Sequence, residues 1–380
     1  MLARTLGEKN EEKEKKVIAN GILLTVISYI FIAILSIFGT EKFLKVFTEK
    51  KEYISFGKTY LSIITLFSFG SVFQILFEKI LEAYGKTKQS MIIQISGSVI
   101  NLILDPILIY GMFGIKALGV RGAAIATVIG QIMGMVIGIV FLINMKILPK
   151  IKYLYLDKET IKQIYKVGFP TIILESLSSF ITIIVNKILI GFSDLAVAVW
   201  GIYVKVQQFI FIIIYGFNYG MIPIVAYNYG AKRNNRVRET IKFFIKMSIT
   251  IAFIGMVAFL LIPETIIGIF GVEQSTMEIG VKAFRILSLG FSFASISMVL
   301  SATFQSLGNG IYSLIVNLSR KILFVLPMIF ILKNILGITS IWISFVVGEI
   351  ITSILAVYIF KTKFYNKLND NIKEGKTSDN

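Results

Sequence analysis

The sequence predicts an all-α, polytopic membrane protein with about ten transmembrane helices in two parallel-repeat bundles. The 380-residue chain is 56% hydrophobic and has a mean hydropathy of +0.80. Its apolar runs are about twenty residues long, which is the length needed to span a bilayer. The two halves of the chain also align with each other after a shift of 223 positions. These observations favour repeated bundles of membrane-spanning helices.

Ten apolar segments are predicted to cross the membrane, and the charges between them set their direction. Loops on one side carry 22 Lys and Arg residues, whereas those on the other side carry 7. The positive-inside rule therefore places the richer side, with both termini, in the cytoplasm. Residues 1–16 are charged throughout, so we expect no cleavable signal. Glu78 and Glu82, beside Lys79, are expected on a solvated helix face near a cytoplasmic end. The segments are 17–38, 54–77, 91–113, 120–143, 168–192, 195–223, 243–262, 278–304, 314–332 and 337–360.

One long segment, residues 144–166, interrupts the succession of apolar spans. Its Lys residues alternate with Ile, Leu and Tyr, which suits a helix lying in the membrane interface, with the Lys side chains on lipid headgroups. We interpret it as a cytoplasmic linker between an N-terminal lobe of four helices, residues 1–143, and a C-terminal lobe of six, residues 167–362. Residues 363–380 are polar and are predicted to be a disordered tail.

The internal repeat is collinear along most of its length. Each aligned span begins on the same side of the membrane, so the two copies run parallel. In the second copy, spans 168–192 and 195–223 precede the aligned region, whereas six residues precede it in the first. We therefore expect that the first two helices of a six-plus-six protein are missing. The matched pairs are Gly7 with Gly230, Lys9 with Lys232, Phe47 with Phe270, Gly57 with Gly280, Gly85 with Gly308, Ser90 with Ser313 and, after a gap of about five, Gly119 with Gly337.

A polar stripe at helical spacing crosses the third apolar segment and consists of Gln94, Ser98, Asn101 and Asp105. Polar side chains inside a membrane generally face a bundle interior or a water-filled cavity. Pro106 follows Asp105 and has no N–H, which frees a backbone carbonyl and favours a kink. The oxygens gathered here suit Na⁺ or a proton. The alternative for Asp105 is a helix-end hydrogen bond to the backbone near Pro106.

These motifs resemble those of multidrug and toxic compound extrusion (MATE) transporters over nearly the whole chain. The most specific match is NLILDP at 101–106 followed by GVRGAAIAT at 119–127. LARTLGEKNEE at the start, AYGKTKQS at 83–90 and YNYGAKRNNRVRE at 227–239 support it. The resemblance implies a cation site formed by Asn101, Asp105 and Thr127. It also implies an aspartate on the first helix, which has no counterpart here. The alternative for Thr127 is close packing of small residues.

A second stripe lies on the first span of the second half and consists of Glu175, Ser179, Thr182 and Asn186. The resemblance implies a coupling or substrate role for Glu175, because several MATE branches use a carboxylate on this helix. We assign the stripe, together with Lys205, as candidate substrate or coupling residues. The alternative for Glu175 is a buried ion pair with Lys205 or Arg285, which would say little about transport.

Composition argues against an enzyme. The chain has no Cys and no His, so no zinc spacing exists, and it has no GxxxxGK[ST] phosphate loop for ATP. The cytoplasmic loops account for the formal net charge of +17 better than nucleic acid binding does. The resemblance implies a monomeric exporter in the inner membrane, in contact with lipids and without a cofactor. It would exchange Na⁺ or H⁺ for small cationic or amphipathic molecules by alternating access.

Two other functions stay open. A lipid or lipid-linked oligosaccharide flippase of the same superfamily would use basic residues for phosphate headgroups, and Lys187, Lys205 and Arg285 keep this interpretation open. The missing helices would instead suit a truncated remnant that no longer transports. Under the flippase hypothesis Lys205→Ala would impair function more than Asp105→Asn does.

Overall fold

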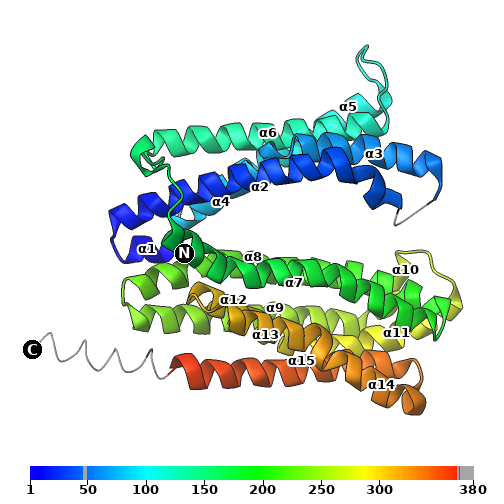
Figure 1. The fold of residues 1–380 in the computed structure, drawn as a ribbon. Coiled ribbons are helices and arrows are strands. Elements are labelled where there is room, and N and C mark those ends of the chain that lie inside the picture. The colour runs from blue at the N-terminus through cyan, green and yellow to red at the C-terminus, as the bar shows by residue number, and fades with distance from the viewer. Residues whose placement is uncertain (46–48, 366–367, 369–380) are drawn as a thin grey trace, which may run out of the picture. The chain divides into compact units, whose positions relative to one another are not determined.

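The computed structural model describes most of the chain, namely residues 1–45, 49–365 and 368. For residues 174, 175 and 177–183 it describes the helical backbone but not the side chains. The described residues form helices and the turns between them, without a strand. Figure 1 shows the chain as a ribbon. Contacts divide it into a first unit, residues 2–161, and a second unit, residues 162–380 together with Met1.

The first unit is a bundle of long helices. α2 packs against α3 and α4, while α5 and α6 form a close pair that α4 also contacts. Ile18, Phe77, Leu81, Ile93 and Leu142 form much of its buried core. In chain order the elements are α1 (Leu2–Gly7), α2 (Glu11–Lys45), α3 (Lys51–Leu66), α4 (Phe69–Ala83), α5 (Thr87–Tyr110), α6 (Val120–Asn144) and the 3₁₀ turn η1 (Ile151–Tyr153).

Glycines on α6 determine how closely its neighbours approach. A Cβ placed on Gly130 would lie 2.5 Å from the carbonyl oxygen of Gly97 on α5, and one on Gly122 would lie 2.4 Å from that of Leu108. Small residues allow helix backbones to pack directly against each other in a membrane protein. This close contact explains why α5 and α6 form a tight pair.

The second unit contains the remaining helices, packed around two apolar clusters. Tyr203, Phe259, Phe284 and Trp342 belong to the larger cluster. α12 lies at the centre of the helix contacts, against α8, α9, α13 and α15. In chain order the elements are α7 (Lys158–Ile190), α8 (Asp194–Gly230), α9 (Asn234–Leu261), α10 (Pro263–Gly268), α11 (Gln274–Ser288), α12 (Phe291–Ser306), α13 (Gly310–Leu318), the π-helical turn η2 (Ser319–Leu323), α14 (Val325–Leu336), α15 (Thr339–Phe360) and the π-helical turn η3 (Lys361–Tyr365).

The predicted repeat is visible in the backbone. Aligned residues at the turns share a positive φ, which few residues other than glycine adopt. The backbone therefore repeats at positions where the sequence repeats. The pairs are Lys9 (φ 54°) with Lys232 (φ 56°), Gly85 (φ 73°) with Gly308 (φ 80°), and Gly119 (φ 54°) with Gly337 (φ 53°).

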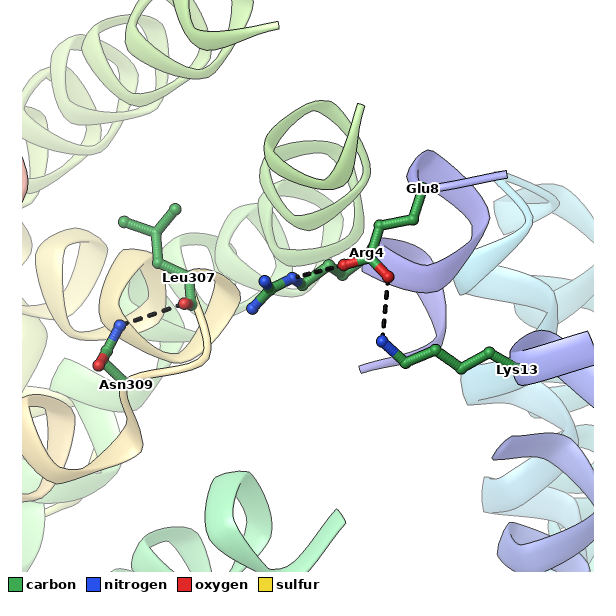
Figure 2. Close-up of polar contacts among 5 residues, drawn as sticks. All are labelled: Arg4, Glu8, Lys13, Leu307 and Asn309. Atoms are coloured by element: carbon green, nitrogen blue, oxygen red, sulfur yellow. Dashed lines mark hydrogen bonds and ion pairs between the residues drawn. The ribbon is translucent and has the colours of Figure 1, made fainter. Parts of the chain in front are cut away.

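Bends and side-chain contacts repeat as well. The break between α3 and α4 bends the chain by 48°, and the break between α11 and α12 bends it by 49°. Ser90 donates to Glu82 at 3.1 Å, and Gln305 donates to the equivalent Ser313 at 2.9 Å. Figure 2 shows polar contacts at two of the repeat turns, each within its own unit. They are Glu8 with Arg4 and Lys13, both at 3.0 Å, and Asn309 with the carbonyl oxygen of Leu307 at 3.2 Å.

Several helices are long and apolar enough to cross a membrane. Among the described residues there are seven such helices, or up to nine if each bent pair forms one span. α7 is a further helix of 33 residues, and its side chains are described only in part. The predicted all-α membrane architecture is therefore present.

Segment 144–166 differs from the interface helix that its composition predicts. α6 ends at Asn144, η1 is a single short turn, and α7 starts at Lys158. Asp157 explains this start, because its carboxylate accepts hydrogen bonds from the backbone and hydroxyl of Thr160, at 2.8 and 2.5 Å. The Asp157 N–H donates to the buried Asn20 on α2 at 2.9 Å. The segment is thus held against α2 instead of forming one helix.

The predicted tail begins with an ordered turn. η3 extends α15, and its Phe364 is buried with its ring 5.2 Å from that of Phe304. Leu368 is also buried. The remaining tail, residues 366–367 and 369–380, lies outside the described residues.

Candidate functional site

The structure brings Asn101 and Thr127 together across the α5–α6 contact. Asn101 Nδ2 donates to Thr127 Oγ1 at 3.4 Å, and that hydroxyl donates to the carbonyl oxygen of Ala123 at 2.9 Å. Gly130 makes this approach possible, since a Cβ there would lie 3.1 Å from Asn101 Cβ. The Thr127 oxygen therefore faces the polar stripe, and the small residues around it also pack the helices. A role for Thr127 in a cation site is therefore compatible with its alternative, close packing of small residues.

Asp105 is half-buried on the same helix, one turn beyond Asn101. Its Oδ1 atom is buried and has no hydrogen-bond partner among the described residues. A buried polar atom without a partner costs free energy, so such an atom points to a ligand or a proton. α5 continues past Pro106 to Tyr110, and the helix-end hydrogen bond considered as the alternative is not found in the described part of the chain.

The chemistry of these groups fits a monovalent cation or a proton. The described residues contain no group of three or more carboxylates, His or Cys that could hold a metal ion. Asp105 supplies one negative charge, and Asn101 and Thr127 supply neutral oxygens nearby. A single carboxylate matches Na⁺ or H⁺ better than a divalent ion, which prefers several charged oxygens.

The stripe on α5 is divided by burial. Gln94 and Ser98 are exposed, whereas Asn101 and Asp105 are half-buried. The buried face at this level is formed by Gly97 and Ile93. The part of the stripe that lies against α6 is therefore its C-terminal half, where Asn101 and Asp105 lie.

Much of the second stripe lies on α7 outside the described side chains, and this applies to Glu175, Ser179 and Thr182. Asn186 is half-buried, and Lys205 on α8 is exposed. Arg285, considered as a partner for Glu175, pairs with Glu264 at 3.1 Å on the protein surface. The substrate or coupling role of the second stripe and of Lys205 therefore stays a prediction.

Glu78 corrects an expectation, because it is buried rather than solvated and exposes only 8% of its surface. Gln74 Nε2 donates to Glu78 Oε1 at 3.0 Å. Gly134 on α6 makes room for Gln74, since a Cβ there would lie 2.6 Å from Gln74 Cδ. Lys79 and Glu82 do form a charged pair, at 2.8 Å. The i, i+4 spacing of the two glutamates could not show that α6 covers one of them.

The sequence interpretation missed an ion pair inside the second unit. Arg320 Nε donates to both carboxylate oxygens of Glu349, at 2.6 and 2.9 Å, and the two side chains are 10% and 15% exposed. Arg320 lies in η2, where Phe324 N donates to Ser319 O at 3.3 Å. Charges within apolar spans are costly and usually functional, and π-helical turns often occur at functional sites. Charged residues inside two neighbouring apolar spans, Arg320 and Lys321 in one and Glu349 in the next, were the available signal.

The ion pair borders a cavity of about 240 Å³ in the second unit. Its wall combines aromatic rings, two basic residues and one carboxylate. Of the candidate site residues whose side chains the structure describes, none lines it. The lining residues are Trp200, Tyr203, Gln207, Tyr215, Leu287, Gly290, Phe291, Ala294, Arg320, Lys321, Phe345 and Glu349.

Known proteins match both the sequence and the fold. The multidrug export protein MepA of Staphylococcus saprophyticus is 26% identical over 360 residues, covering 94% of this chain and 78% of that protein. MepA of Staphylococcus haemolyticus is 26% identical over 366 residues, with the same coverages. These relatives are longer than this chain. The expected loss of two helices is not confirmed by these coverages and stays a prediction.

Solved structures show the same architecture. A crystal structure described as MATE in the bent conformation has a TM-score of 0.90 and 21% identity, and the match covers 98% of this chain and 82% of that one. A MOP superfamily transporter from Pyrococcus furiosus has a TM-score of 0.87 and 21% identity. This match covers 97% of this chain and 82% of that one. The predicted fold class is confirmed. The sequence profile of the MatE family matches residues 1–107 and 170–331, which is more than half of the chain, and the protein therefore belongs to the MatE family.

Proposed function

We propose that this chain exports small cationic or amphipathic molecules in exchange for Na⁺ or H⁺ entering from outside. Two observations outside the site support export, namely the family and the relatives named as multidrug export proteins. The observation that carries the coupling proposal is the buried, unpartnered Oδ1 atom of Asp105 beside the Asn101–Thr127 contact. A carboxylate in this setting gains by binding a cation or a proton.

The coupling argument is thermodynamic. An ion drives a conformational cycle only if it binds the two states with different affinity. Packing helices around a neutralised Asp105 costs less than packing them around a bare carboxylate, because an uncompensated charge is expensive in a low-dielectric interior. Ion binding at Asp105 would therefore favour the more closely packed state, and release of the ion would favour the other.

The test is dye efflux from cells that lack their own exporters. We expect Asp105→Asn to abolish ion-driven efflux while the protein still reaches the membrane, because an amide neither binds Na⁺ as a carboxylate does nor releases a proton. Asp194→Asn, an exposed change of the same type at the start of α8, is the matched control and should retain efflux. Normal efflux by Asp105→Asn would refute the coupling role.

We further propose that the protein is a monomer in the plasma membrane, with residues 144–166 as the cytoplasmic linker between the lobes. The excess of Lys and Arg in one set of loops supports this orientation, and single-cysteine labelling tests it. The predicted roles of Glu175, Ser179, Thr182, Asn186 and Lys205 in substrate binding or coupling belong to the same proposal. The flippase alternative gains no support, because Lys187 and Lys205 are exposed and Arg285 pairs with Glu264.

A further inference from the structure

Glu78 on α4 is a buried carboxyl that the proposed coupling at Asp105 does not use. It exposes 8% of its surface. Its Oε1 atom accepts one hydrogen bond, at 3.0 Å from Gln74 Nε2, and its Oε2 atom accepts none from the residues that the structure describes. One neutral donor compensates an ionised carboxylate poorly, whereas a protonated carboxyl has no charge to compensate. The surroundings of Glu78 therefore favour a bound proton.

The charged groups near Glu78 do not supply a counter-ion. Lys79 and Glu82, both on α4, are the charged residues that act on it, and no charge from another described helix adds to theirs. Lys79 Nζ donates to both carboxylate oxygens of Glu82, at 3.1 and 2.8 Å. These two charges are paired with each other, and their effects on Glu78 oppose one another. The helices that pack on α4 contribute apolar side chains such as Ile93 and Leu142 to the core beside it.

Gln74 joins Glu78 to the contact between α5 and α6. Both of these helices pack with α4 (Figure 1). A Cβ on Gly134 of α6 would lie 2.6 Å from Gln74 Cδ, and one on Gly97 of α5 would lie 3.6 Å from Gln74 Nε2. The amide therefore occupies space that glycines on both helices leave open. Gly97 lies one helical turn before Asn101, so the amide lies about one turn from the level of the candidate cation site.

Polar side chains continue from this amide to Asp105. Thr127 and Gln131 follow each other at one turn of α6, and Asn101 and Asp105 do so on α5. The Oε1 atom of Gln131 and the Oδ1 atom of Asp105 are buried, and neither has a hydrogen-bond partner among the described residues. Buried acceptors of this kind are usually satisfied by water. They lie one turn to either side of the Asn101–Thr127 contact, so polar groups that can hold water lead from Asp105 toward Glu78.

The repeat shows that the fold does not require a carboxyl at this position. Ser301 aligns with Glu78 when the sequence is shifted by 223 positions. Ser301 is also buried, and its hydroxyl meets that of Ser313 at 2.7 Å and accepts from Asn317 Nδ2 at 2.6 Å. A neutral side chain therefore fills the equivalent place in the second copy, whereas the buried carboxyl belongs to the copy that contains Asp105.

Glu78 lies close to one end of α4. Glu82 follows it by one helical turn, and the Glu82 side chain is 20% exposed. α4 ends at Ala83, before the turn at Gly85. This is the end that the excess of Lys and Arg in the loops assigns to the cytoplasm. A proton that leaves Glu78 therefore has a short way to bulk water.

We propose that Glu78 is the inner proton site of the first unit, through which the coupling proton passes from Asp105 to the cytoplasm. Glu78 first releases its own proton to cytoplasmic water and becomes a carboxylate. A proton then leaves the neutral Asp105 carboxyl, moves through water held by the amides and the Thr127 hydroxyl, and neutralises Glu78 again. This inference rests on the proposed export function and makes H⁺ its coupling ion, because a carboxyl bonded to an amide N–H lacks the oxygen ligands that Na⁺ needs.

Infrared spectroscopy tests the bound proton directly, because the C=O stretch of a protonated carboxyl is separate from the bands of a carboxylate. In nanodiscs at neutral pH, we expect the difference spectrum between the unchanged protein and Glu78→Gln to show a protonated carboxyl. Gln has nearly the shape of Glu, so the variant should keep its fold, checked by far-UV circular dichroism. Glu52→Gln, an exposed change of the same type on α3, is the matched control and should show no such difference.

Transport tests the route. In proteoliposomes without Na⁺, a proton gradient should drive ethidium, a cationic aromatic probe, across the membrane. Glu78→Gln should lower this transport by about tenfold or more, because an amide neither takes up nor releases a proton. Ethidium binding to the same variant in nanodiscs should be unchanged, whereas general damage to the protein would weaken it. Glu78→Asp keeps a carboxyl and should restore part of the transport.

Three results would overturn the proposal: no protonated carboxyl at Glu78, proton-driven transport by Glu78→Gln at the rate of the unchanged protein, or transport driven by Na⁺ alone. Asp105→Asn should lose transport and keep the Glu78 band. If Asp105→Asn loses transport while Glu78→Gln keeps it, the export proposal stands and this one fails. If the unchanged protein moves no ethidium, the export proposal fails, while the infrared band still decides whether Glu78 holds a proton.

Discussion

Asp157 shows how one residue sets the start of a long helix and makes it sensitive to acid. Hydrogen bonds from the hydroxyl and the backbone N–H of Thr160 lower the pKa of the Asp157 carboxyl below its ordinary value, and nearby Lys16 adds to this. A lowered pKa means that the cap stabilises the fold fully at neutral pH. Its contribution is lost as the pH falls through the folded-state pKa, below about pH 4.

We predict that the first turn of α7 loses amide protection below about pH 4, because the protonated Asp157 side chain caps it less well. Hydrogen exchange measured by mass spectrometry, corrected for the intrinsic effect of pH, reports this turn directly. Asp157→Asn is the matched control, since an amide caps a helix comparably but does not titrate. Equal acid sensitivity in both proteins would show that another group controls the turn.

At the scale of elements, the pairing of α5 with α6 depends on glycine. A Cβ on Gly130 would lie 2.5 Å from a backbone oxygen of Gly97, so the helices must move apart to admit a methyl group. The same movement would lengthen the Asn101–Thr127 contact, which already measures 3.4 Å. The site residues are therefore held by helix packing as much as by their own hydrogen bonds.

Gly130→Ala should destabilise the first unit by roughly 1–3 kcal/mol, the usual cost of overpacking a tight contact. Gly39→Ala on α2 is the control, because nothing lies within 4 Å of the added Cβ and alanine is the better helix former. Thermal unfolding followed by far-UV circular dichroism compares the two. An unchanged midpoint for Gly130→Ala would mean that α5 and α6 separate at little cost.

At the scale of the whole molecule, the proposed orientation makes a prediction that the chain is well suited to test. It has no cysteine, so a single introduced cysteine is the only labelling site. Lys88→Cys lies in the first turn of α5, in a segment proposed to be cytoplasmic, and Lys116→Cys lies in a loop proposed to be outside. A membrane-impermeant maleimide added to intact cells should label the second but not the first.

Permeabilising the cells should then allow Lys88→Cys to be labelled. This control shows that the membrane, and not burial within the protein, protected the cysteine in intact cells. The reverse pattern, with Lys88→Cys labelled in intact cells, would invert the orientation. It would also invert the direction in which Asp105 receives its ion.

The features that depend on short stretches of chain can be predicted from the residues there. Apolar length predicts membrane-spanning helices, and the repeat of turn residues such as Gly85 and Gly308 predicts matching backbone, which the structure shows. The motif resemblance also predicts the meeting of Asn101 with Thr127. The first two predictions succeed because hydropathy and turn chemistry act within a few residues of one another, whereas the third depends on the family resemblance.

Which charged side chains are buried depends on contacts between helices that are distant in sequence. Glu78 is buried and accepts a hydrogen bond from Gln74, which packs against Gly134 of α6. Arg320 in η2 meets Glu349 of α15 in a nearly buried ion pair. Asn20 holds the start of α7 against α2. Each of these outcomes depends on the close packing of helices distant in sequence, and helical spacing within one segment carries no information about the neighbour that covers it.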